Sequence, residues 1–450
     1  MTLDEYINSF KHKRVGVVGV GVSNLPLLRL LAENGIDVTA HDKNPAAARP
    51  ELTEKGVKWV LGENYLDALD YDLVFRTPGL HPEKLLPGLG AHTAVTSEME
   101  AFFEVCPCEI IAVTGSDGKT TTTTVISEIL KAAGRRVWVG GNIGTPLLDK
   151  AGEMAPSDLC VLELSSFQLM TMHRAPHIAV ITNVAPNHLD VHKDMAEYVA
   201  AKRNIFDCAP QPAAVVLNAD NDITRAFAAD VRGEVRFFSR RERIGLGAYS
   251  DGESVYLDGA PVLPVSEILI PGAHNVENYM AAFAATRDYA SPAVMAQVAR
   301  TFPGVAHRIE LVRTLRGVRY YNDSIASSPS RTLAGLRSFR QKLILIAGGH
   351  DKHIPFDGLA KEMQDHVKAL FLVGETAEAI RRAVISAPGY DPEALPVTVL
   401  EDFRETVLAA AAYAREGDVV ILSPACSSFD KFKNFAERGD TFRKIVESLE

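Results

Sequence analysis

Several features are scarce in this chain of 450 residues, and each absence excludes a class of protein. No apolar run approaches the roughly 20 residues that a membrane-spanning helix needs. The first ten residues, MTLDEYINSF, also lack the basic-then-apolar pattern of a signal peptide. Excess positive charge is missing, since the formal net charge is −10 at pH 7. We therefore expect a cytoplasmic protein that acts on neither membranes nor nucleic acid.

Cysteine is also scarce. The five cysteines are scattered and odd in number, which favours reduced thiols over a framework of disulfides. Cys106 and Cys108 form a close pair, but their spacing is not that of a zinc site and no second pair accompanies them. What remains is an ordinary globular composition, with 47% hydrophobic residues in a chain long enough for two or three domains.

Three blocks of alternating strand and helix patterns follow one another, which predicts an α/β protein with parallel sheets and three domains, 1–96, 97–306 and 307–450. Within the second block the pattern changes over about 235–269 to short strands with SDGES and LDGAP turns. This segment predicts a small antiparallel sheet appended to the parallel one. The expected strands of the three blocks lie at 14–21, 37–42, 71–79 and 92–97; at 108–114, 135–141, 159–164, 177–184 and 213–218; and at 317–323, 342–349, 369–375 and 418–424.

The segment TGSDGKTT, 114–121, predicts a phosphate-binding loop between a strand and a helix. A glycine-rich turn at a helix N-terminus points backbone N–H groups at an anion. Lys119 would reach the β- and γ-phosphates of a nucleotide, and Thr120 would hold Mg²⁺. The first glycine of the general motif is missing, because Val113 occupies its place.

Two further residues follow strand ends of the same block. Glu163 ends the apolar strand LCVLEL, where a carboxylate is expected only if it is paired or bound to a metal ion. The alternative is a carboxylate satisfied by backbone N–H groups. His188 follows the strand HIAVITNV, and His192 is a nearby competitor for the same role. Because such strand ends meet at one edge of a sheet, we expect Glu163 beside the phosphate loop.

Lys202 lies in an apolar stripe of a predicted helix, together with Met195, Tyr198, Val199, Ile205 and Phe206. A lysine in such a stripe either extends its amine to solvent or loses its charge through a lowered pKa. Spacing alone favours the first alternative. In the second, a neutral amine can react with CO2 to give a carbamate, which would be an anionic ligand for a second Mg²⁺.

Other polar residues have two interpretations each. Asn275 and Asn278 could bind a base edge, although Asn275 could equally cap a helix. Arg308 suits a phosphate and Asp323 suits ribose hydroxyls, although both could be solvated surface charges. GVGVSN, 19–24, resembles a dinucleotide fingerprint, with Asp42 near the position of the ribose-binding acid, but Asn24 replaces the third glycine. A helix N-terminus binds any diphosphate, so a UDP-sugar fits this loop as well as NAD.

Taken together, these motifs resemble those of the Mur ligases, over nearly the whole chain. The matching strings are GVGVSN, TGSDGKTT, GGNIGTP, LELSSFQL, NVAPNHLD, AAKRNIF, GAHNVEN, AHRIE, NDSIASSP, AGGHDK and LSPACSSFDKFKNFAERG. The last string is similar to the acceptor-side signature of the D-glutamate-adding members, and the DNPR string of the diaminopimelate-adding members is absent. The resemblance implies a monomeric enzyme that ligates D-glutamate to UDP-N-acetylmuramoyl-L-alanine with ATP and Mg²⁺ at two sites, through an acyl phosphate.

The resemblance also implies a Rossmann-like UDP-binding domain, a central ATPase domain and a Rossmann-like C-terminal domain that binds the amino acid. The UDP-linked substrate would contact Gly21, Val22, Ser23, Asp42, Thr77, Pro78, Gly79 and Asn142. ATP would contact Gly115, Ser116, Asp117, Gly118, Lys119, Thr120, Thr121, Asn275, Asn278, Arg308 and Asp323. Glu163 and Thr120 would hold one Mg²⁺, and His188 with carbamylated Lys202 the other; the catalytic set would be Lys119, Glu163, His188 and Lys202. D-glutamate would contact Lys352, Ser428 and Phe435.

The chain departs from the family pattern at Ile325, where many members have a lysine after the NDS triplet; Arg331 is a candidate substitute. Three alternatives to a D-glutamate ligase stay open from the sequence. One is a sibling ligase, such as another Mur enzyme or a folylpolyglutamate synthetase. Another is a nicotinamide-dependent oxidoreductase that uses GVGVSN. The last is a regulatory or transport ATPase that forms no ligated product.

Overall fold

The computed structural model describes residues 1–189 and 191–450. The chain forms two compact units. The first contains Met1–Ser266 and Val276–Val298, and the second contains Glu267–Asn275 and Ala299–Glu450. Three sheets separated by helices build these units, which confirms the predicted α/β class. No helix among the described residues is long and apolar enough to cross a membrane.

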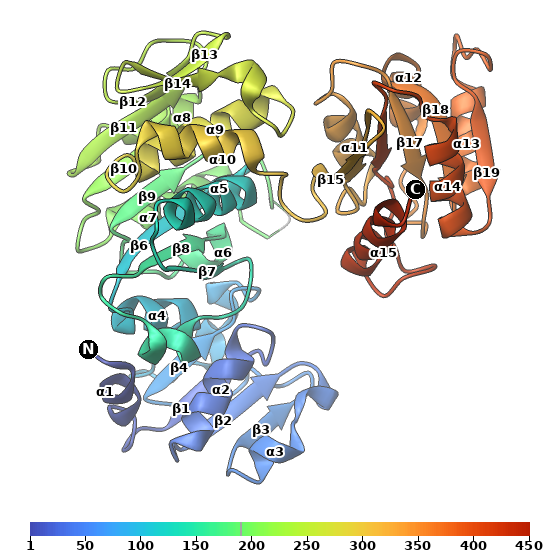
Figure 1. Ribbon diagram of the computed structural model, residues 1–450. Helices are drawn as coiled ribbons and strands as arrows, with labels where there is room; N and C mark the ends of the chain where they lie inside the picture. Colours follow the sequence, from blue (N-terminus) through green and yellow to red (C-terminus); the bar gives the residue numbers. More distant parts are fainter. Residues whose placement is uncertain (190) are drawn as a thin grey trace. The chain divides into compact units, whose positions relative to one another are not determined.

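The first sheet has five strands in the order β3-β2-β1-β4-β5, all parallel (Figure 1). The strands are β1 Val15–Val18, β2 Val38–Asp42, β3 Lys58–Leu61, β4 Leu73–Arg76 and β5 Ala94–Thr96. The accompanying helices are α1 Leu3–Asn8, α2 Asn24–Glu33 and α3 Pro50–Thr53, with short 3-10 turns at Pro45–Ala47, Pro82–Lys84 and Leu86–Gly88. The strand order switches at β1, because β2 and β3 follow on one side of it and β4 and β5 on the other. A ligand crevice is expected at such a switch point, where β1 and β4 end. The sequence pattern did not predict β3.

The second sheet has nine strands in the order β14-β13-β12-β11-β10-β9-β6-β8-β7. The strands are β6 Glu109–Thr114, β7 Val137–Gly141, β8 Leu159–Glu163, β9 Ile178–Ile181, β10 Ala214–Asn218, β11 Glu234–Ser239, β12 Gly247–Ser250, β13 Ser254–Leu257 and β14 Ala260–Pro264. Strands β6 to β12 pair with one another in parallel. Strand β13 pairs antiparallel with both β12 and β14. The predicted antiparallel strands are therefore present only over β12 to β14, which continue the parallel sheet at its edge (Figure 1). The first strand of the predicted segment, β11, is instead parallel to both of its neighbours.

Helices connect and cover the strands of the second sheet. They are α4 Glu98–Val105, α5 Lys119–Ala132, α6 Ser166–Leu169, α7 Met195–Asp207, α8 Asp222–Phe227, α9 Ala273–Thr286 and α10 Pro292–Thr301, with 3-10 turns at Leu148–Glu153 and Val265–Glu267. β8, β9 and β10 are buried along their whole length. Burial on both faces explains why these strands are continuous apolar runs rather than alternating patterns.

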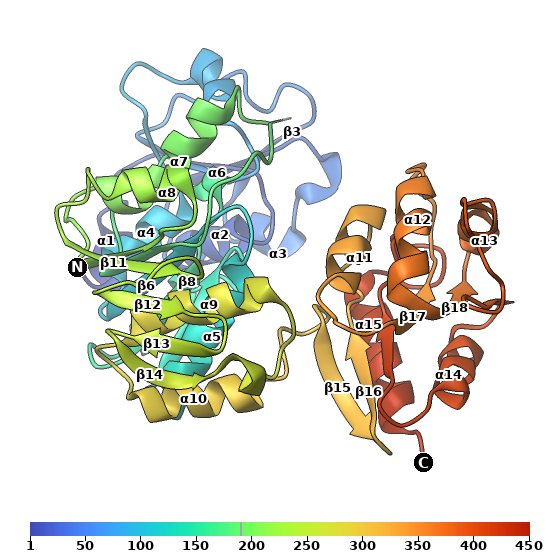
Figure 2. The same cartoon turned by 90° about the horizontal axis from the view of Figure 1, so that it is seen from above.

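The third sheet belongs to the second unit and has the order β15-β16-β20-β17-β18-β19. Figure 2 labels β15 to β18 of this sheet. Its strands are β15 Glu310–Leu315, β16 Val318–Asn322, β17 Leu343–Ala347, β18 Val367–Val373, β19 Val397–Leu400 and β20 Val419–Leu422. Only the edge strand β15 runs antiparallel to its neighbour among the described strands of this sheet. The helices are α11 Pro329–Leu336, α12 Asp357–His366, α13 Ala377–Ile385, α14 Phe403–Tyr413 and α15 Phe435–Glu447.

One hydrophobic core runs through both sheets of the first unit. Helix α4, which follows β5, contributes the buried Met99 and Phe102, and these belong to the same cluster as Val17 of the first sheet and Ala112 of the second. The proposed boundary between residues 96 and 97 thus lies next to a helix whose side chains belong to the common core. The three-domain division stays a prediction.

This shared core predicts that the two sheets of the first unit unfold together. The only two tryptophans of the chain report on them separately, because Trp59 is in β3 and Trp138 is in β7, and both pack against this core. The variants Trp59→Phe and Trp138→Phe should show the same urea midpoint by fluorescence. Phe102→Ala should lower the free energy of unfolding by about 3–5 kcal/mol with either reporter.

The matched control is Phe429→Ala, because Phe429 is 67% exposed and lies in the second unit. It should leave both midpoints unchanged. Two clearly separated midpoints for the two reporters would contradict a common core.

Candidate active site

The phosphate loop lies between β6 and α5, as the sequence predicts. Gly115 and Gly118 have positive φ values of 150° and 79°. A side chain at either position would collide with a neighbour: a Cβ at Gly115 would lie 1.9 Å from Thr182 Oγ1, and one at Gly118 would lie 2.3 Å from Asn278 Oδ1. Glycine is therefore required twice, and the loop exposes backbone at the N-terminus of a 14-residue helix.

Neighbouring strands fix the loop in place. Ser116 Oγ donates to the carbonyl of Ala185, and the backbone N–H of Asp117 donates to Asn183 Oδ1. Lys119 Nζ donates to the carbonyls of Gly115 and Ser116 at 3.0 Å each, so the lysine is folded over the loop. The arrangement gives a cation and a set of N–H groups at one helix end, which is the chemistry that binds a polyphosphate.

Glu163 lies beside this loop, as predicted. It is 1% exposed, its Oε2 accepts a hydrogen bond of 2.7 Å from Thr120 Oγ1, and its Oε1 accepts one of 2.7 Å from Asn142 Nδ2. Gly141, with φ 96°, allows the close approach of β7, because a Cβ there would lie 2.2 Å from the carbonyl oxygen of Glu163. The alternative in which backbone N–H groups satisfy the carboxylate is wrong, since side chains occupy both oxygens.

The donors around Glu163 fit Mg²⁺. The ion prefers oxygen ligands and keeps several waters, so one carboxylate and one hydroxyl beside a phosphate are enough. A site made of protein side chains alone is not found: among the described residues, no three His, Cys, Asp or Glu side chains gather in a way that could hold a metal ion.

Lys202 is buried rather than extended to solvent, so the interpretation that spacing favoured is wrong. The side chain is 1% exposed. Its Nζ donates to the carbonyl of Gly115 at 2.7 Å and lies 4.6 Å from the ring centroid of Tyr198. Burial lowers the pKa of Lys202 to about 7, and the charge of Lys119 adds to this effect. The amine thus contacts the phosphate loop directly and is partly neutral at pH 7.

The two candidate histidines have different environments. His188 is exposed, has φ 56° and contacts the ring of Phe167 at a centroid distance of 5.1 Å. His192 is buried, with Nε2 2.9 Å from Ser166 Oγ and Nδ1 3.4 Å from a carboxylate oxygen of Glu197. His188 is therefore open to solvent, whereas His192 is enclosed by protein groups. Asp190, two residues after His188 in the sequence, is the one residue outside the described part of the chain.

The first sheet places the other predicted loops at its crevice. Asp42 Oδ2 accepts from the N–H of Val20, so this carboxylate holds the GVGVSN loop rather than projecting away from it. A Cβ at Gly19 would lie 2.5 Å from Thr77 Cγ2, which brings the loop after β4 against the loop after β1. Asn24, in place of the third glycine, donates to the carbonyls of Val18 and Gly19. The loops that carry Gly21, Val22, Ser23, Thr77, Pro78 and Gly79 therefore follow the adjacent ends of β1 and β4.

In the second unit, Asp323 and Arg308 are close enough to interact electrostatically. Asp323 is buried, and its carboxylate accepts from Ser423 Oγ at 2.8 Å and from the N–H of Ile309 at 3.3 Å. Burial raises the pKa of Asp323 to about 7, against the opposing effects of Arg308 and Arg331. The interpretation of Asp323 as a solvated surface charge is wrong. Arg331 is exposed on α11, and its charge acts on Asp323.

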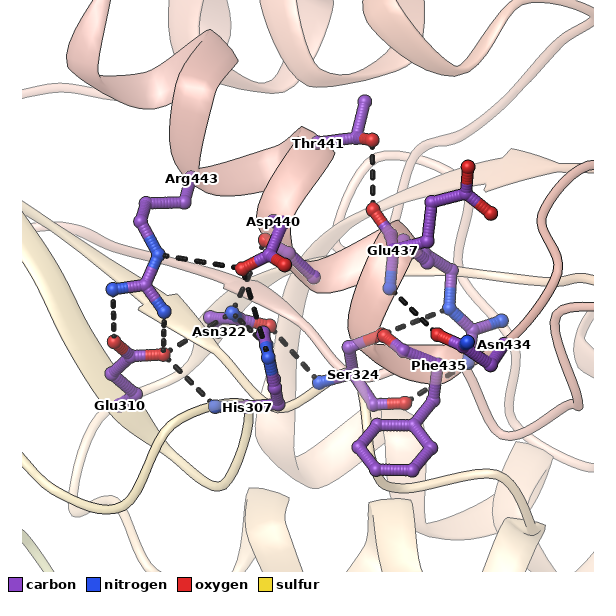
Figure 3. Close-up of polar contacts among 12 residues, drawn as sticks. His307, Glu310, Asn322, Ser324, Asn434, Phe435, Glu437, Asp440, Thr441 and Arg443 are labelled. Atoms are coloured by element: carbon purple, nitrogen blue, oxygen red, sulfur yellow. Dashed lines mark hydrogen bonds and ion pairs between the residues drawn. The ribbon is translucent and has the colours of Figure 1, made fainter. Parts of the chain in front are cut away.

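The predicted amino-acid ligands come from three segments of the second unit. Lys352 Nζ donates to the carbonyl of Ser327 at 3.1 Å, and Ser428 is buried. Phe435 begins α15 and is 40% exposed. Figure 3 shows its backbone carbonyl accepting from Ser324 Oγ at 2.7 Å.

A polar network supports the start of α15. His307 Nδ1 lies 3.0 Å from Asn322 Nδ2, and its ring contacts that of Phe435 (Figure 3). Glu310 accepts from the N–H of His307 and from Arg443, so the Arg308 loop and α15 are fixed to each other. This network holds the segment that carries Arg308 beside the segment that carries Phe435.

The two asparagines of α9 have different roles in the fold. Asn278 lies against the phosphate loop and accepts from Thr122 Oγ1 at 3.3 Å. Asn275 donates from Nδ2 to the carbonyl of Pro271 at 2.5 Å. It lies inside the helix, which starts at Ala273, so its interpretation as an N-cap is wrong.

Comparison with protein-family models matches residues 113–286 to the Mur ligase middle domain and residues 307–426 to the Mur ligase glutamate ligase domain. A protein of Acetivibrio thermocellus named UDP-N-acetylmuramoylalanine--D-glutamate ligase is 50% identical over 464 residues, covering 100% of this chain and 99% of that protein. One of the same name from Clostridium novyi is 48% identical over 455 residues, with coverage of 100% and 99%. This chain belongs to the Mur ligase family.

Solved structures agree with this assignment at the level of fold. A diaminopimelate-adding Mur ligase has a TM-score of 0.59, 18% identity and coverage of 84% of this chain and 93% of that chain. A UDP-N-acetylmuramate-alanine ligase from Thermotoga maritima has a TM-score of 0.58, 18% identity and coverage of 98% and 100%. Membership of the Mur ligases removes the oxidoreductase and the regulatory ATPase as alternatives.

Sequence reasoning missed several residues that shape this Mur ligase site. Tyr198 supports Lys202 and its hydroxyl lies 3.0 Å from Ser116 Oγ; the signal was its position four residues before Lys202 on one helix face. Asn183 holds Asp117, and its place at a strand end beside the phosphate loop could have indicated this. Arg76, which is fully buried, gave no local signal.

The buried amine of Lys202 predicts a pH dependence of stability. Below pH 7 the amine is charged in both the folded and the unfolded chain, so the full cost of burying a charge is present. Between about pH 7 and 10.5 the folded chain has released a proton that the unfolded chain still binds, so this cost falls as pH rises. The free energy of unfolding of Lys202→Met minus that of the unchanged protein should therefore be highest below pH 7. This difference should fall by about 5 kcal/mol towards pH 10.5.

Urea unfolding in CO2-free buffers measures this difference. Lys150→Met is the matched control, because the Lys150 side chain is 47% exposed in the same unit, and its difference should not vary with pH. A difference for Lys202→Met that is constant or rises with pH would contradict a buried Lys202 amine with a lowered pKa.

Proposed function

We propose that this Mur ligase joins D-glutamate to UDP-N-acetylmuramoyl-L-alanine, driven by ATP, in the synthesis of peptidoglycan precursors. The observation that carries the proposal is the full-length identity of up to 50% with relatives named for this reaction. The geometry of the phosphate loop supports it, because Thr120, Glu163 and Lys202 all lie within hydrogen-bond reach of that loop or of one another. A carboxylate must be activated before it forms an amide, and a nucleotide bound at this loop would supply the phosphoryl group for that activation.

For the UDP-linked substrate we propose the first domain, residues 1–96, with Asn142 from the second. The contact set is Gly21, Val22, Ser23, Asp42, Thr77, Pro78 and Gly79. The convergence of the two loops after β1 and β4 supports this set, as does the 78% exposure of Val22 on the first loop. A diphosphate at the N-terminus of α2 would meet free backbone N–H groups.

For ATP we propose the central domain, residues 97–306. The phosphates would contact the loop and helix start at Gly115, Ser116, Asp117, Gly118, Lys119, Thr120 and Thr121, with Asn278 against the loop. Lys119 now donates to two carbonyls of the loop and would turn its Nζ to the β- and γ-phosphates. For adenosine and phosphate we also propose Asn275 of the central domain and Arg308 and Asp323 of the third domain.

We propose two Mg²⁺ positions, one held by Thr120 and Glu163 and one by His188 and carbamylated Lys202. Mg²⁺ there would neutralise phosphoryl oxygens as charge moves between them. A lysine with a pKa of about 7 supports the carbamate, since only the neutral amine reacts with CO2. The product is an anion next to the phosphate loop, where the unmodified lysine would place a second cation beside Lys119.

The reaction would have two steps. The terminal carboxylate of the UDP-linked substrate attacks the γ-phosphorus of ATP and becomes an acyl phosphate, with release of ADP. The amine of D-glutamate then attacks the acyl carbon and inorganic phosphate leaves. Lys119 would stabilise the charge on the transferred group in the first step, and Asn142 with His188 would hold the sugar-peptide near it.

For D-glutamate we propose the third domain, residues 307–450, with Lys352, Ser428 and Phe435. A lysine amine pairs with a carboxylate of the amino acid, and the exposed ring of Phe435 covers its aliphatic part. We propose a monomer in the cytoplasm, with no nucleic-acid or membrane partner. The five cysteines, all free thiols, support a reducing compartment.

The proposal predicts the acceptor specificity. With ATP, Mg²⁺ and UDP-N-acetylmuramoyl-L-alanine, phosphate release and a ligated product detected by mass should appear with D-glutamate. They should not appear with L-glutamate, L-lysine or meso-diaminopimelate. Ligation of another amino acid would keep the ligase mechanism and overturn the roles of Lys352, Ser428 and Phe435. Phosphate release without a ligated product from any acceptor would overturn the proposed function.

Removing the charge of Glu163 tests the first metal position. Glu163→Gln keeps the size of the side chain but removes an anionic ligand, so the half-saturating Mg²⁺ concentration for ligation should rise at least about tenfold. Titration of activity with Mg²⁺ at saturating ATP measures this value. Glu153→Gln is the control, since Glu153 is an exposed carboxylate of the same unit. An unchanged Mg²⁺ requirement in Glu163→Gln would contradict the assignment.

A further inference from the structure

Arg76 is a buried cation without an anion. It ends β4 and is 0% exposed. Burial lowers its pKa to about 10, so it keeps its charge at neutral pH, and no carboxylate among the described residues pairs with it. A buried charge of this kind is costly unless hydrogen bonds compensate it, which raises the question of what the side chain does.

The guanidinium donates to acceptors in two separate segments of the chain. One terminal nitrogen donates to the carbonyls of Thr77, Pro78 and Leu80, at 3.2, 3.2 and 2.5 Å. The other donates to the carbonyl of Phe167 at 2.8 Å and to Thr171 Oγ1 at 3.0 Å. The first group of acceptors is the loop after β4. The second is α6 and the turn that follows it, which the chain reaches only three residues after Glu163.

This bonding leaves Arg76 unable to bind a phosphate itself. Both terminal nitrogens are engaged by protein oxygens, and the remaining Nε is buried without a partner. An arginine with available N–H groups is a common phosphate ligand. Here the side chain instead determines the shape of the loop after β4 and the distance of that loop from α6.

The same segment is attached to the second sheet farther along. His81 Nε2 lies 3.3 Å from Glu197 Oε2, and Glu83 pairs with Lys193. Glu197 also faces the buried His192, four residues after His188. The loop after β4 is therefore fixed at one end by Arg76 and at the other by groups next to the phosphate-loop edge of the second sheet.

We infer that Arg76 is a positioning residue: it fixes the Thr77–Leu80 loop, as a holder of the UDP-linked substrate, at a set distance from the ATP site. The inference rests on the proposed function, in which this loop contacts that substrate. In a phosphoryl transfer the reacting carboxylate must approach to about 3–3.5 Å, and small misplacement slows the reaction strongly. A rigid loop meets this requirement, and five hydrogen bonds from one planar group give that rigidity.

The test compares kinetic constants in Arg76→Lys with those of the unchanged enzyme. A lysine keeps the charge but cannot reach both acceptor groups with a planar fork. The KM for UDP-N-acetylmuramoyl-L-alanine should rise about tenfold and kcat should fall by a similar factor. The Kd of ATP, measured alone by calorimetry, should stay within about twofold. Arg29→Met is the matched control, because Arg29 is an exposed arginine on α2, and it should leave all constants unchanged.

A second variant keeps the test valid if Arg76→Lys does not fold. Thr171→Val removes only one acceptor across the two sheets and keeps the shape of the side chain. It should raise the same KM severalfold, and in an Arg76→Lys background, where that variant folds, it should add little further effect. A KM for the UDP-linked substrate within twofold in both single variants would overturn the inference. So would an equal loss of ATP affinity, which would indicate general damage.

The unchanged enzyme separates this inference from the proposed function. If it does not ligate D-glutamate to UDP-N-acetylmuramoyl-L-alanine, the proposed function fails. If it does, and the variants match it, the inference about Arg76 alone fails.

Discussion

The close packing of the phosphate loop against neighbouring strand ends is the constraint on which the site depends. Four parallel strands in the order β9-β6-β8-β7 end at one edge of the sheet, and each contributes to the loop or to what lies beside it. Gly115 and Gly118 leave no room for a side chain, because Thr182 and Asn278 fill the space on the far side. Neighbouring residues thus fix the shape of the loop, together with the hydrogen bonds of Lys119 to its carbonyls.

The first unit also buries two cations, Lys202 and Arg76. Lys202 and Arg76 are both essentially without exposure, and each is compensated by oxygen dipoles rather than by a paired carboxylate within hydrogen-bond distance. They differ in chemistry, however. A lysine responds to burial by losing its proton near neutral pH, which makes it reactive towards CO2, whereas an arginine keeps its charge and can only organise what surrounds it. In the proposed mechanism, Lys202 takes part in the chemistry of the site, and Arg76 positions a loop beside it.

Local sequence patterns predicted the parts of the site that lie near each other along the chain or at strand ends. The phosphate loop and the contact of Thr120 with Glu163 both follow from the rule that parallel strands end at one edge. The resemblance to the Mur ligases added the remaining ligand roles, which stay predictions. The fold class followed from the alternation of strands and helices, and even the antiparallel strands near residues 247–264 were visible in their turns.

Contacts between distant segments could not be predicted in this way. Arg76 bonds to residues 91 and 95 positions away, and nothing in the letters VFRTPG indicates that the arginine is buried. The burial of Lys202 could likewise not be predicted from the apolar stripe of its helix. The spacing of the residues along the helix is the same whether the lysine extends to solvent or is buried. The common core around Phe102 and the strand β3 were missed because each depends on what packs against it.

In the proposed reaction, ATP activates the carboxylate of the UDP-linked substrate. The most direct measurement uses UDP-N-acetylmuramoyl-L-alanine with an ¹⁸O-labelled carboxyl group and determines the label in the released phosphate by mass. An acyl phosphate predicts one labelled oxygen in the phosphate for each amide bond formed. Ligated product with unlabelled phosphate would contradict the account.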